Sequence, residues 1–455
     1  DRLTDRLDAA FTHPVLGGIV FLTAMATIFL AIFRLAELPM ELIESGCAWL
    51  QSTLAANLPE GAISSLLTDG IIGGVSGTIV FLPQICLLFF LLALLEDTGY
   101  LARAAFVMDR IMCRFGLPGQ AFVPLLSSHA CALPGIMSAR LIPDPKDRLA
   151  TILVAPFMSC SARVGVYVLL VTMLFPESPL FAGLAFAGCY ALGAVAALLT
   201  AAIFRRTILR GRSRPMVLEL PPYRVPDLRG ALLTTYDRAV VFLKNAGSVI
   251  LAICIVLWWL SAYPKSDAPA ESLALGERAA LVETQAESAV DAAAREELVL
   301  EAESLRTEAD VLAARAQQQS SFAGRLGSAI EPVFAPLGLD DRLTVAVLTS
   351  FLAREVFRST ITVLVGSGDS DDDVAVASDL SKATRADGTP LFDTATTASL
   401  LVFYVLALQC LPTLAVTRRE TGSWKWAGLQ LGWMSLVAYA AAFAVRAIVL
   451  AAGGA

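Results

Sequence analysis

Runs of apolar residues long enough to cross a lipid bilayer recur along this chain, and they rule out an ordinary soluble fold. Such runs cover residues 15–36, 71–95, 149–174 and 180–204. A helix needs roughly 20 apolar residues to cross the hydrocarbon core of a membrane. Only 16% of the 455 residues are charged and 56% are hydrophobic, whereas soluble domains carry about 25% charged residues. The sequence therefore predicts an all-α, polytopic helical membrane protein.

Further membrane helices are expected at residues 239–260, 398–416 and 426–450, and Pro83 is expected to bend the helix over 71–95. The stretch over 40–67 is expected to be a loop with amphipathic pieces. The first apolar run is too long for the core of a signal peptide. Because the chain does not begin with Met, we expect it to be a piece of a longer protein.

A charged segment interrupts the apolar pattern between residues 264 and 320. It holds twelve acidic and five basic residues, which accounts for the formal net charge of −7. Residues 277–319 lack Gly and Pro and are rich in Ala, Glu, Leu and Arg, which favours helix. We expect a long helix or a hairpin on the outer face, as a spacer or protein contact rather than a metal-collecting surface. It separates a first membrane half (1–263) from a second (321–455).

Two segments, at about 117–140 and 337–365, are expected to enter the membrane and return. Clusters of Arg and Lys face the cytoplasm, and two of them, at 103–114 and 140–148, flank the first segment. That segment therefore cannot simply cross. Counting crossings requires the second segment to return from the outer face. Two return segments entered from opposite sides form an inverted repeat, a plan that secondary transporters use.

Soft metal donors lie inside these apolar segments. His129 and Cys131 precede Pro134 and Gly135, residue types that interrupt helices. Polar groups at membrane depth are costly and indicate a functional site, and sulfur beside imidazole favours a late first-row transition metal. A kinked helix with a buried thiol is the alternative. His129 could equally be a hydrogen-bonded core histidine unless the helix unwinds, because residues two apart do not share a helix face.

A second group of donors follows Pro156, where Met158, Ser159 and Cys160 lie in sequence. Cys160 is a soft donor, and the serine could bond free carbonyls or water. Arg163, about one turn later, needs an anionic or carbonyl partner at membrane depth. Acidic residues of the second return segment are candidates for that partner.

The second return segment and the last third of the chain supply the remaining candidates. Glu355 lies in apolar sequence next to Arg354, and a buried glutamate is paired, protonated or a ligand. A structural pair of Glu355 with Arg354 or Arg163 is the alternative. Near the end, Cys410 again stands beside a proline, Pro412. The remaining membrane cysteines are expected to be core residues, because a free cysteine packs as a small hydrophobe: Cys86, Cys113, Cys189 and Cys254.

Together these segments resemble the membrane domain of the FeoB-type ferrous iron transporters, over nearly the whole chain. In that family the return segments are called gate motifs, and membrane cysteines are proposed to handle Fe(II). The resemblance implies that role for Cys131, Cys160 and Cys410. The matching motifs are His13–Gly17, Val80–Gln84, Leu94–Tyr100, Cys131–Arg140, Ala155–Arg163, Ala353–Glu355 and Arg419–Trp426.

The resemblance implies import of Fe2+ as transported substrate across the bacterial cytoplasmic (inner) membrane. Its implied partners are the lipid bilayer, a GTPase domain of the same protein and small Feo-type accessory proteins; an oligomer fits the sequence as well as a monomer. No basic stripe indicates nucleic acid. The chain lacks the phosphate loop G-x-x-x-x-G-K-[ST]. This chain is therefore not expected to hydrolyse GTP. GTP would affect transport only through the GTPase domain that the resemblance implies and this chain lacks.

One departure from the family pattern leaves the identity of the transported metal open. The first gate usually contains Gly-Cys-Asn, whereas here the sequence is Ala130-Cys131-Ala132 after His129. The asparagine ligand is thus missing, and His129 gains interest as a donor. The alternatives are transport of another divalent metal, transport of a small organic solute such as a nucleoside, and a membrane metal sensor or scaffold.

Overall fold

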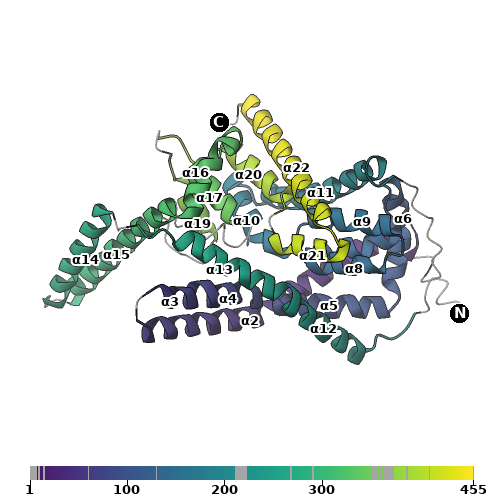
Figure 1. Ribbon diagram of the computed structural model, residues 1–455, viewed down its shortest axis with the longest axis horizontal. Helices are drawn as coiled ribbons and strands as arrows, with labels where there is room; N and C mark the ends of the chain where they lie inside the picture. Colours follow the sequence, from purple (N-terminus) through teal and green to yellow (C-terminus); the bar gives the residue numbers. More distant parts are fainter. Residues whose placement is uncertain are drawn as a thin grey trace. The chain divides into compact units, whose positions relative to one another are not determined.

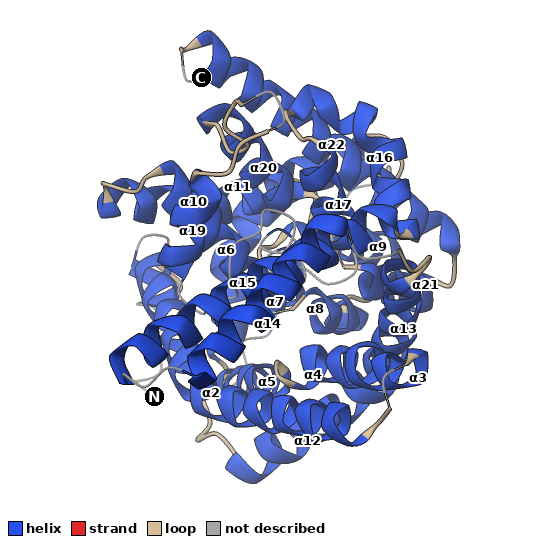
Figure 2. Ribbon diagram, turned by 90° about the vertical axis from the view of Figure 1, so that its left-hand side faces the viewer, coloured by secondary structure: helices blue, strands red, loops and turns tan. Residues whose placement is uncertain are grey.

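The protein consists of helices and loops (Figure 2), so the all-α prediction is confirmed. The computed structural model describes residues 8, 11–13, 16–59, 61–129, 131–210, 223–266, 269–288, 292–350, 357, 361, 373–385, 388–408 and 410–453. The helices (Figure 1) are α2 (Leu16–Asn57), α3 (Ala62–Ser65), α4 (Gly73–Ile79), α5 (Leu82–Asp97), α6 (Tyr100–Arg114), α7 (Phe122–Ser128), α8 (Ala132–Ser138), α9 (Pro145–Val154), α10 (Val164–Leu174), α11 (Pro179–Arg206), α12 (Leu228–Phe242), α13 (Ser248–Ala262), α14 (Ala270–Ser288), α15 (Ala292–Ser320), α16 (Phe322–Phe334), α17 (Asp341–Ser350), α19 (Asp373–Ser381), α20 (Thr394–Leu406), α21 (Leu411–Thr421) and α22 (Trp424–Ala451).

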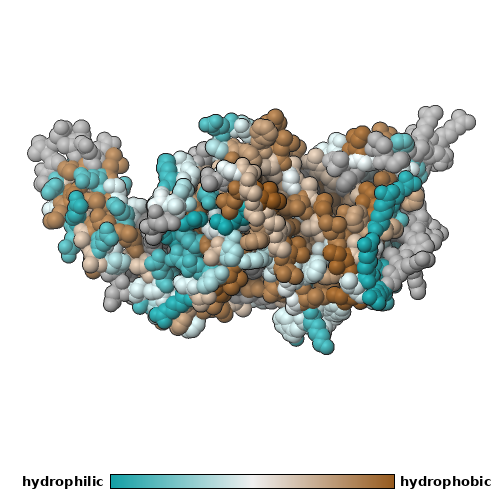
Figure 3. All heavy atoms as spheres, turned by 90° about the horizontal axis from the view of Figure 1, so that it is seen from above, coloured by the Kyte–Doolittle hydropathy of each residue, from teal (hydrophilic) through white to brown (hydrophobic). Residues whose placement is uncertain are grey.

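Several of these helices are built to cross a membrane, as the apolar runs predict. Among the described residues, helix α2, the stretch from α9 to α10, helix α11, the stretch from α20 to α21, and helix α22 are long and apolar enough. Helices α5 and α6 pass the same test together but bend by 87°, as a broken span or a re-entrant pair would. Large apolar side chains such as Leu180 and Leu184 are exposed, and hydrophobic residues cover much of the surface seen in Figure 3. The chain is a multi-pass membrane protein.

The chain forms two compact units, each assembled from three stretches of sequence. The first unit comprises Asp1–Ser161, Gly188–Ile255 and Cys410–Leu436. In it, α5 packs against α2 and α12, and α8 packs against α7 and α21. In the second unit, α10 packs against α19 and α20, and α16 packs against α17. Cys131, Cys160 and Cys410 therefore belong to the same unit.

The first helix is longer than the sequence predicts. The expectation of a loop over residues 40–67 is wrong for most of its length, because α2 continues through Pro39 to Asn57. The amphipathic residues after Pro39 continue the helix, because the proline does not end it. After a short connection, α3 and a π-helical turn that begins at Leu66 follow. Where a bend at Pro83 was expected, the helix is interrupted: α4 ends at Ile79 and α5 starts at Leu82 with the proline in its first turn, where a missing N–H costs no helical hydrogen bond.

Other expected helices are interrupted rather than continuous. The helix expected over 149–174 is divided by non-helical residues 158–160. The one expected over 398–416 appears as α20, which ends at Leu406, and α21, which begins at Leu411. The helix expected over 239–260 contains a π-helical turn at Leu243–Gly247. Such breaks leave backbone groups without helical partners, and in a membrane those groups must be satisfied by neighbouring protein.

The acidic insert is a hairpin, which decides between the two forms that its composition allows. Helices α14 and α15 lie side by side (Figure 1). Small side chains such as Ala279 and Ala302 are buried between them, and the Ser272 hydroxyl donates to the Ala309 carbonyl at 2.9 Å. Charged residues face outward, where Arg306 pairs with Glu283. Alanine at the seam lets the two helices approach closely without a large apolar core.

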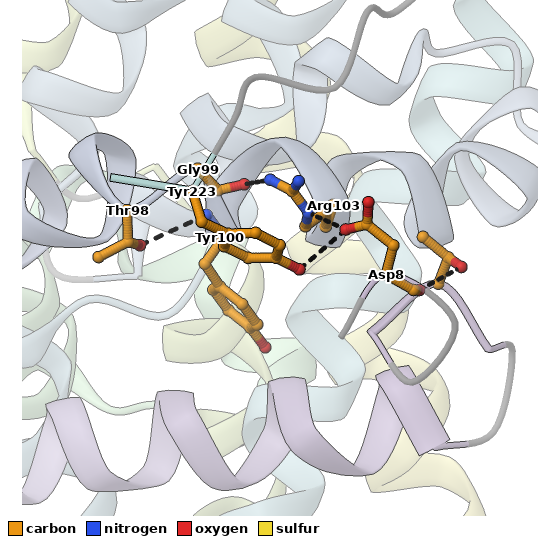
Figure 4. A network of polar contacts seen from close by, with 7 residues as sticks. Asp8, Thr98, Gly99, Tyr100, Arg103 and Tyr223 are labelled. Carbon is orange, nitrogen blue, oxygen red and sulfur yellow. Dashed lines mark hydrogen bonds and ion pairs between the residues drawn. The ribbon is translucent and has the colours of Figure 1, made fainter. Parts of the chain in front are cut away.

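A buried arginine fastens the corner between α5 and α6 (Figure 4). Arg103 is 1% exposed; its Nε donates to Asp8 Oδ1 at 2.6 Å and its Nη1 to the Gly99 carbonyl at 2.8 Å. The Tyr223 hydroxyl donates to the same Asp8 oxygen at 2.9 Å, and its ring lies 3.7 Å from the guanidinium carbon. Gly99 turns the corner with φ 77, which favours glycine. Three segments distant in sequence therefore meet at one charge.

Candidate functional site

Cys131 lies where the first expected gate unwinds. Helix α7 ends at Ser128 and α8 begins at Ala132, and Cys131 between them has an extended backbone with φ −155 and ψ 131. Its thiol is half-buried. The predicted return segment is thus two short helices joined at the cysteine.

Pro134 and Gly135 lie just after this break rather than in it. Both are buried within the first turns of α8, where proline costs no helical hydrogen bond. Gly135 instead allows α7 and α8 to touch, because a Cβ here would lie 1.9 Å from Ser128 Oγ and 2.8 Å from the Pro124 carbonyl oxygen. The glycine therefore fixes how closely the two halves of the segment pack.

Cys160 lies at a second break. Helix α9 ends at Val154, a 3₁₀ turn covers Ala155–Phe157, and residues 158–160 are non-helical before the next turn at Ser161–Arg163. Met158 is 5% exposed and Ser159 is fully buried, whereas Cys160 is half-buried. The 3₁₀ turn packs against both α7 and α8, so the second break lies beside the first.

Cys410 stands at a third break and repeats the geometry of Cys131. It precedes α21 with an extended backbone, φ −146 and ψ 93, and Pro412 lies in the first turn of that helix. Helices α8 and α21 pack against each other. Arg140, just after α8, donates to both carboxylate oxygens of Glu420 in the last turn of α21, at 2.6 and 2.5 Å. Both helices therefore run from a half-buried cysteine toward one bidentate ion pair.

Arg163 finds the carbonyl partners that the sequence allowed. Its side chain is 1% exposed; Nη1 donates to the Val405 carbonyl at 2.6 Å and Nη2 to the Ala407 carbonyl at 3.3 Å. These carbonyls lie at the C-terminal end of α20, which carries partial negative charge because its last carbonyls lack helical donors. The guanidinium thus caps the break that precedes Cys410.

His129 lies at the end of α7, and the unwinding that coordination would require is present two residues later. Its backbone is still helical, with φ −65 and ψ −28. Its ring is half-buried and stacks on Tyr190 of α11, with centroids 6.1 Å apart. Stacking helps to orient the imidazole.

The three breaks do not form one compact metal centre. Within the part of the chain that the structure describes, no three His, Cys, Asp or Glu side chains come together around a point that could hold a metal ion. Glu355 and Arg354 lie outside the described residues, so their proposed roles stay predictions. Any metal bound at these cysteines would need carbonyl, hydroxyl, thioether or water ligands as well.

Two residues at the breaks escaped the sequence analysis. Gln430 of α22 is 1% exposed, and its Nε2 donates to the Ile152 and Leu153 carbonyls at 2.9 and 3.2 Å. Gly193 of α11 packs on the break itself, because a Cβ there would lie 2.6 Å from the Phe157 carbonyl oxygen. A lone amide inside a membrane-length apolar helix was the signal that could have identified Gln430.

Comparison with known proteins assigns the family. A model named Gate and described as "Nucleoside recognition" matches residues 78–174 and 243–424, more than half of the chain. A second, described as "Ferrous iron transport protein B C terminus", matches residues 186–238. The chain belongs to the FeoB family. It corresponds to the membrane region of these proteins, and each predicted gate segment falls inside one of the matched Gate stretches.

Curated FeoB relatives align along almost the whole chain. The Fe(2+) transport protein A/Fe(2+) transporter FeoB fusion protein of Porphyromonas gingivalis is 39% identical over 98% of this chain and 51% of its own length. The Fe(2+) transporter FeoB of Leptospira biflexa is 38% identical over 97% and 59%, and that of Helicobacter pylori 35% identical over 96% and 65%. The chain thus spans between about half and two thirds of these relatives. No solved structure matches it.

Proposed function

We propose that this chain is the membrane core of a ferrous iron importer, in which Fe(II) passes the helix breaks at Cys131, Cys160 and Cys410. The observation that carries the proposal is the position of these cysteines. Each stands at an interruption of a helix, two of them at the starts of neighbouring helices that end at one ion pair. The printed names of the FeoB relatives, which call them Fe(2+) transporters, supply the substrate.

The chemistry of the breaks suits a metal in transit. A thiol is a soft ligand that Fe(II) accepts, and unwound backbone offers carbonyl oxygens to a cation. Because the described residues provide no cluster of three His, Cys, Asp or Glu ligands, the site at each of these helix breaks would hold the metal weakly. Conduction needs binding weak enough for release. Met158, Ser159 and His129 are the candidates for additional ligands, and Glu355 is the candidate acid from the second gate.

The two Gate stretches are proposed to enter the membrane from opposite faces as an inverted repeat. Arg140, Arg418 and Arg419 lie around the ends of α8 and α21, and clusters of this kind face the cytoplasm. With that orientation, the cysteine ends of both helices lie deeper in the bilayer and the ion pair lies at its inner surface. Fe(II) would therefore reach the cysteines before the cytoplasmic ends, as import across the bacterial inner membrane requires.

Coupling to nucleotide hydrolysis is proposed to come from protein outside this chain. The chain lacks a phosphate loop, and the FeoB relatives extend well beyond the aligned part. A GTPase domain of the full-length protein would then drive or gate passage. The fusion in the Porphyromonas gingivalis relative makes a protein of the Fe(2+) transport protein A type a candidate accessory partner.

The test is anaerobic Fe(II) flux into proteoliposomes that contain this chain. We expect flux in the parent and its loss when Cys131, Cys160 and Cys410 are all changed to Ser, because a hydroxyl is a harder and weaker donor for Fe(II) than a thiolate. Cys86→Ser is the matched control, since Cys86 is also half-buried but lies inside the regular helix α5. Panels with Zn(II), Mn(II) and Mg(II) measure selectivity.

A second candidate function follows from the description of the Gate model, "Nucleoside recognition". A carrier of nucleosides or similar organic solutes would keep its flux in the triple Ser variant, because it has no need of thiols. Uridine flux that survives the triple change, with no Fe(II) flux in the parent, would establish this alternative. Fe(II) binding without flux of either solute would instead indicate a metal sensor or scaffold.

A further inference from the structure

The helix break before Cys160 leaves a backbone carbonyl, that of Ile152, that its own helix cannot satisfy in the regular way. In a regular helix the N–H of residue 156 would bond the Ile152 carbonyl, but residue 156 is proline and has no N–H. Ile152 and Leu153 are each 1% exposed. A buried carbonyl without a donor costs about 1–3 kcal/mol, and inside a membrane no water is at hand to supply one. Another part of the protein must therefore donate.

Gln430 supplies that donor from a different helix. Its Nε2 donates to the Ile152 carbonyl at 2.9 Å and to the Leu153 carbonyl at 3.2 Å. Its Oε1 accepts from the Thr417 hydroxyl at 2.8 Å. An amide has one acceptor and one donor end. Because the two carbonyls can only accept, they fix the Nε2 end toward the break, and the Thr417 hydroxyl satisfies the Oε1 end that remains. All these groups are buried within the first unit.

Thr417 connects the break to the helix that starts at Cys410. It lies seven residues into α21, about two turns from Cys410, and is fully buried. The end of α9, which leads into Met158 and Cys160, is thereby joined through Gln430 to α21. Gln430 itself lies beyond the stretch that the Gate model matches, which ends at residue 424. It touches none of the candidate ligands in the contacts described above.

We propose that Gln430 is a positioning residue, which holds the Cys160 break and the Cys410 break at a fixed spacing through Thr417. The proposal rests on the proposed metal path for its consequence but not for its geometry. Without the amide, the freed carbonyls of α9 repack and the chain around Cys160 shifts relative to α21. The metal would then meet the two thiols at the wrong separation, while the fold of the unit persists.

The test compares Gln430→Leu with Trp433→Phe. Trp433 is a matched control on the same helix: its Nε1 donates to Thr200 Oγ1 at 3.1 Å, so the change also removes one hydrogen bond between helices, but not at a break. Two readouts are needed. The first is the rate at which a maleimide alkylates Cys160 and Cys410, each kept as the sole path cysteine. The second is Fe(II) flux, with the half-saturating concentration and the maximal rate determined separately.

We expect Gln430→Leu to change both alkylation rates and to raise the half-saturating Fe(II) concentration about tenfold, the size of effect seen when a partner that orients a metal ligand is removed. Trp433→Phe should change neither. Unchanged alkylation in Gln430→Leu, or the same change in Trp433→Phe, would overturn the proposal. Because alkylation needs no iron, it tests the positioning role even if the chain moves no Fe(II).

A second pair of variants covers the case in which Gln430→Leu does not fold. Thr417→Val removes the hydroxyl that satisfies the amide oxygen and keeps the side-chain shape, whereas Thr417→Ser keeps the hydroxyl. We expect Thr417→Val to reproduce the alkylation change and Thr417→Ser to behave as the parent. Equal behaviour of the two variants would show that the hydroxyl does not hold Gln430, and the proposal would fail.

Discussion

Two arginines in this protein are equally buried but have different partners. Arg103 and Arg163 are each 1% exposed. Arg103 lies at the α5–α6 corner and binds the Asp8 carboxylate, the Gly99 carbonyl and the face of Tyr223. Arg163 follows the Cys160 break and donates to the Val405 and Ala407 carbonyls. One site is a salt bridge with a cation–π contact, and the other is a charged cap on a broken helix.

The difference shows two ways of stabilising a buried positive charge. A carboxylate cancels the charge but must itself be desolvated, at a cost that can match the attraction. The end of a broken helix supplies fixed partial charges that are already in place, and in return the arginine satisfies carbonyls that the break has freed. The cap therefore suits a place where a break must persist, as beside Cys410. The salt bridge suits a corner where distant segments must be joined.

The largest effect on stability is expected at a third arginine, Arg205, whose salt bridge is buried on both sides. Arg205 and Asp147 pair at 2.5 Å with each side chain 5% exposed. Asp147→Asn leaves the guanidinium buried without its counter-charge, which should cost about 3–5 kcal/mol of unfolding free energy. Denaturation in detergent micelles measures this loss. The double variant Asp147→Asn/Arg205→Met should recover much of it, and a double variant no better than the single would contradict the charge explanation.

Removal of the Arg163 cap should lower stability somewhat less than Asp147→Asn does, but should impair function more. Arg163→Met leaves the Val405 and Ala407 carbonyls without these donors, and each such group costs about 1–3 kcal/mol. Arg163→Lys keeps the charge but cannot span two carbonyls as a planar fork does. We therefore expect both variants to alter alkylation of Cys410, with Lys intermediate. If Lys matched the parent in alkylation and stability, charge alone and not the fork would hold the break.

The all-α membrane class of the fold was predictable from the sequence, because the thickness of a bilayer sets the length of the apolar runs that cross it. The breaks were harder to predict, since a proline acts differently at different positions. Pro39 passes inside α2, Pro134 and Pro412 sit in first turns where they cost nothing, and Pro156 follows the end of α9. Only the position of a helix start distinguishes these cases, and neighbouring helices decide that position.

The candidate site was predictable in its residue types but not in its supports. The thiols stood out because soft donors are unusual in membrane-length sequence. Gln430 did not, because its partners are backbone carbonyls 278 and 277 residues away. No side-chain pattern marks a carbonyl acceptor, so the sequence cannot name it. The same reason left the partner of Arg163 open between an acid and a carbonyl.

The salt bridge between Arg103 and Asp8 should make the stability of the protein depend on pH in the acid range. The hydrogen bond from Arg103, together with that from Tyr223, lowers the pKa of Asp8 below its usual 3.8, against the opposing effect of burial. A lowered pKa in the folded state means that the contribution is complete above pH 3.8 and is lost as the pH falls below it. Asp8→Asn should lower stability at pH 6 by less than the two preceding changes and flatten the acid dependence. Thermal midpoints in micelles between pH 6 and about 3 test this; an unchanged acid slope would exclude Asp8.

The same corner has an alkaline limit. Burial, and next the hydrogen bond to Asp8, raise the pKa of Tyr223 to about 12 from its usual 10.0. The neutral phenol is thus favoured in the folded state, so its contribution is present below pH 10 and is lost as the pH rises toward 12. Tyr223→Phe keeps the ring under Arg103 but removes this dependence. Ultraviolet titration of the phenolate, parent against variant, measures it.

The smallest effect is expected where an arginine pair is exposed. Arg306 and Glu283 bridge α14 and α15, but their side chains are 53% and 45% exposed. Water screens such a pair, and holding two long side chains costs entropy, so Arg306→Gln should change stability by only about 0–1 kcal/mol. The hairpin is held instead by its alanine seam and the Ser272 bond. Ala302→Glu, which places a charge in that seam, should therefore disrupt the hairpin far more than loss of the ion pair. Helicity of the full chain and protease cleavage between α14 and α15 give the comparison, and equal sensitivity in both variants would mean that the surface charges, not the seam, hold the hairpin together.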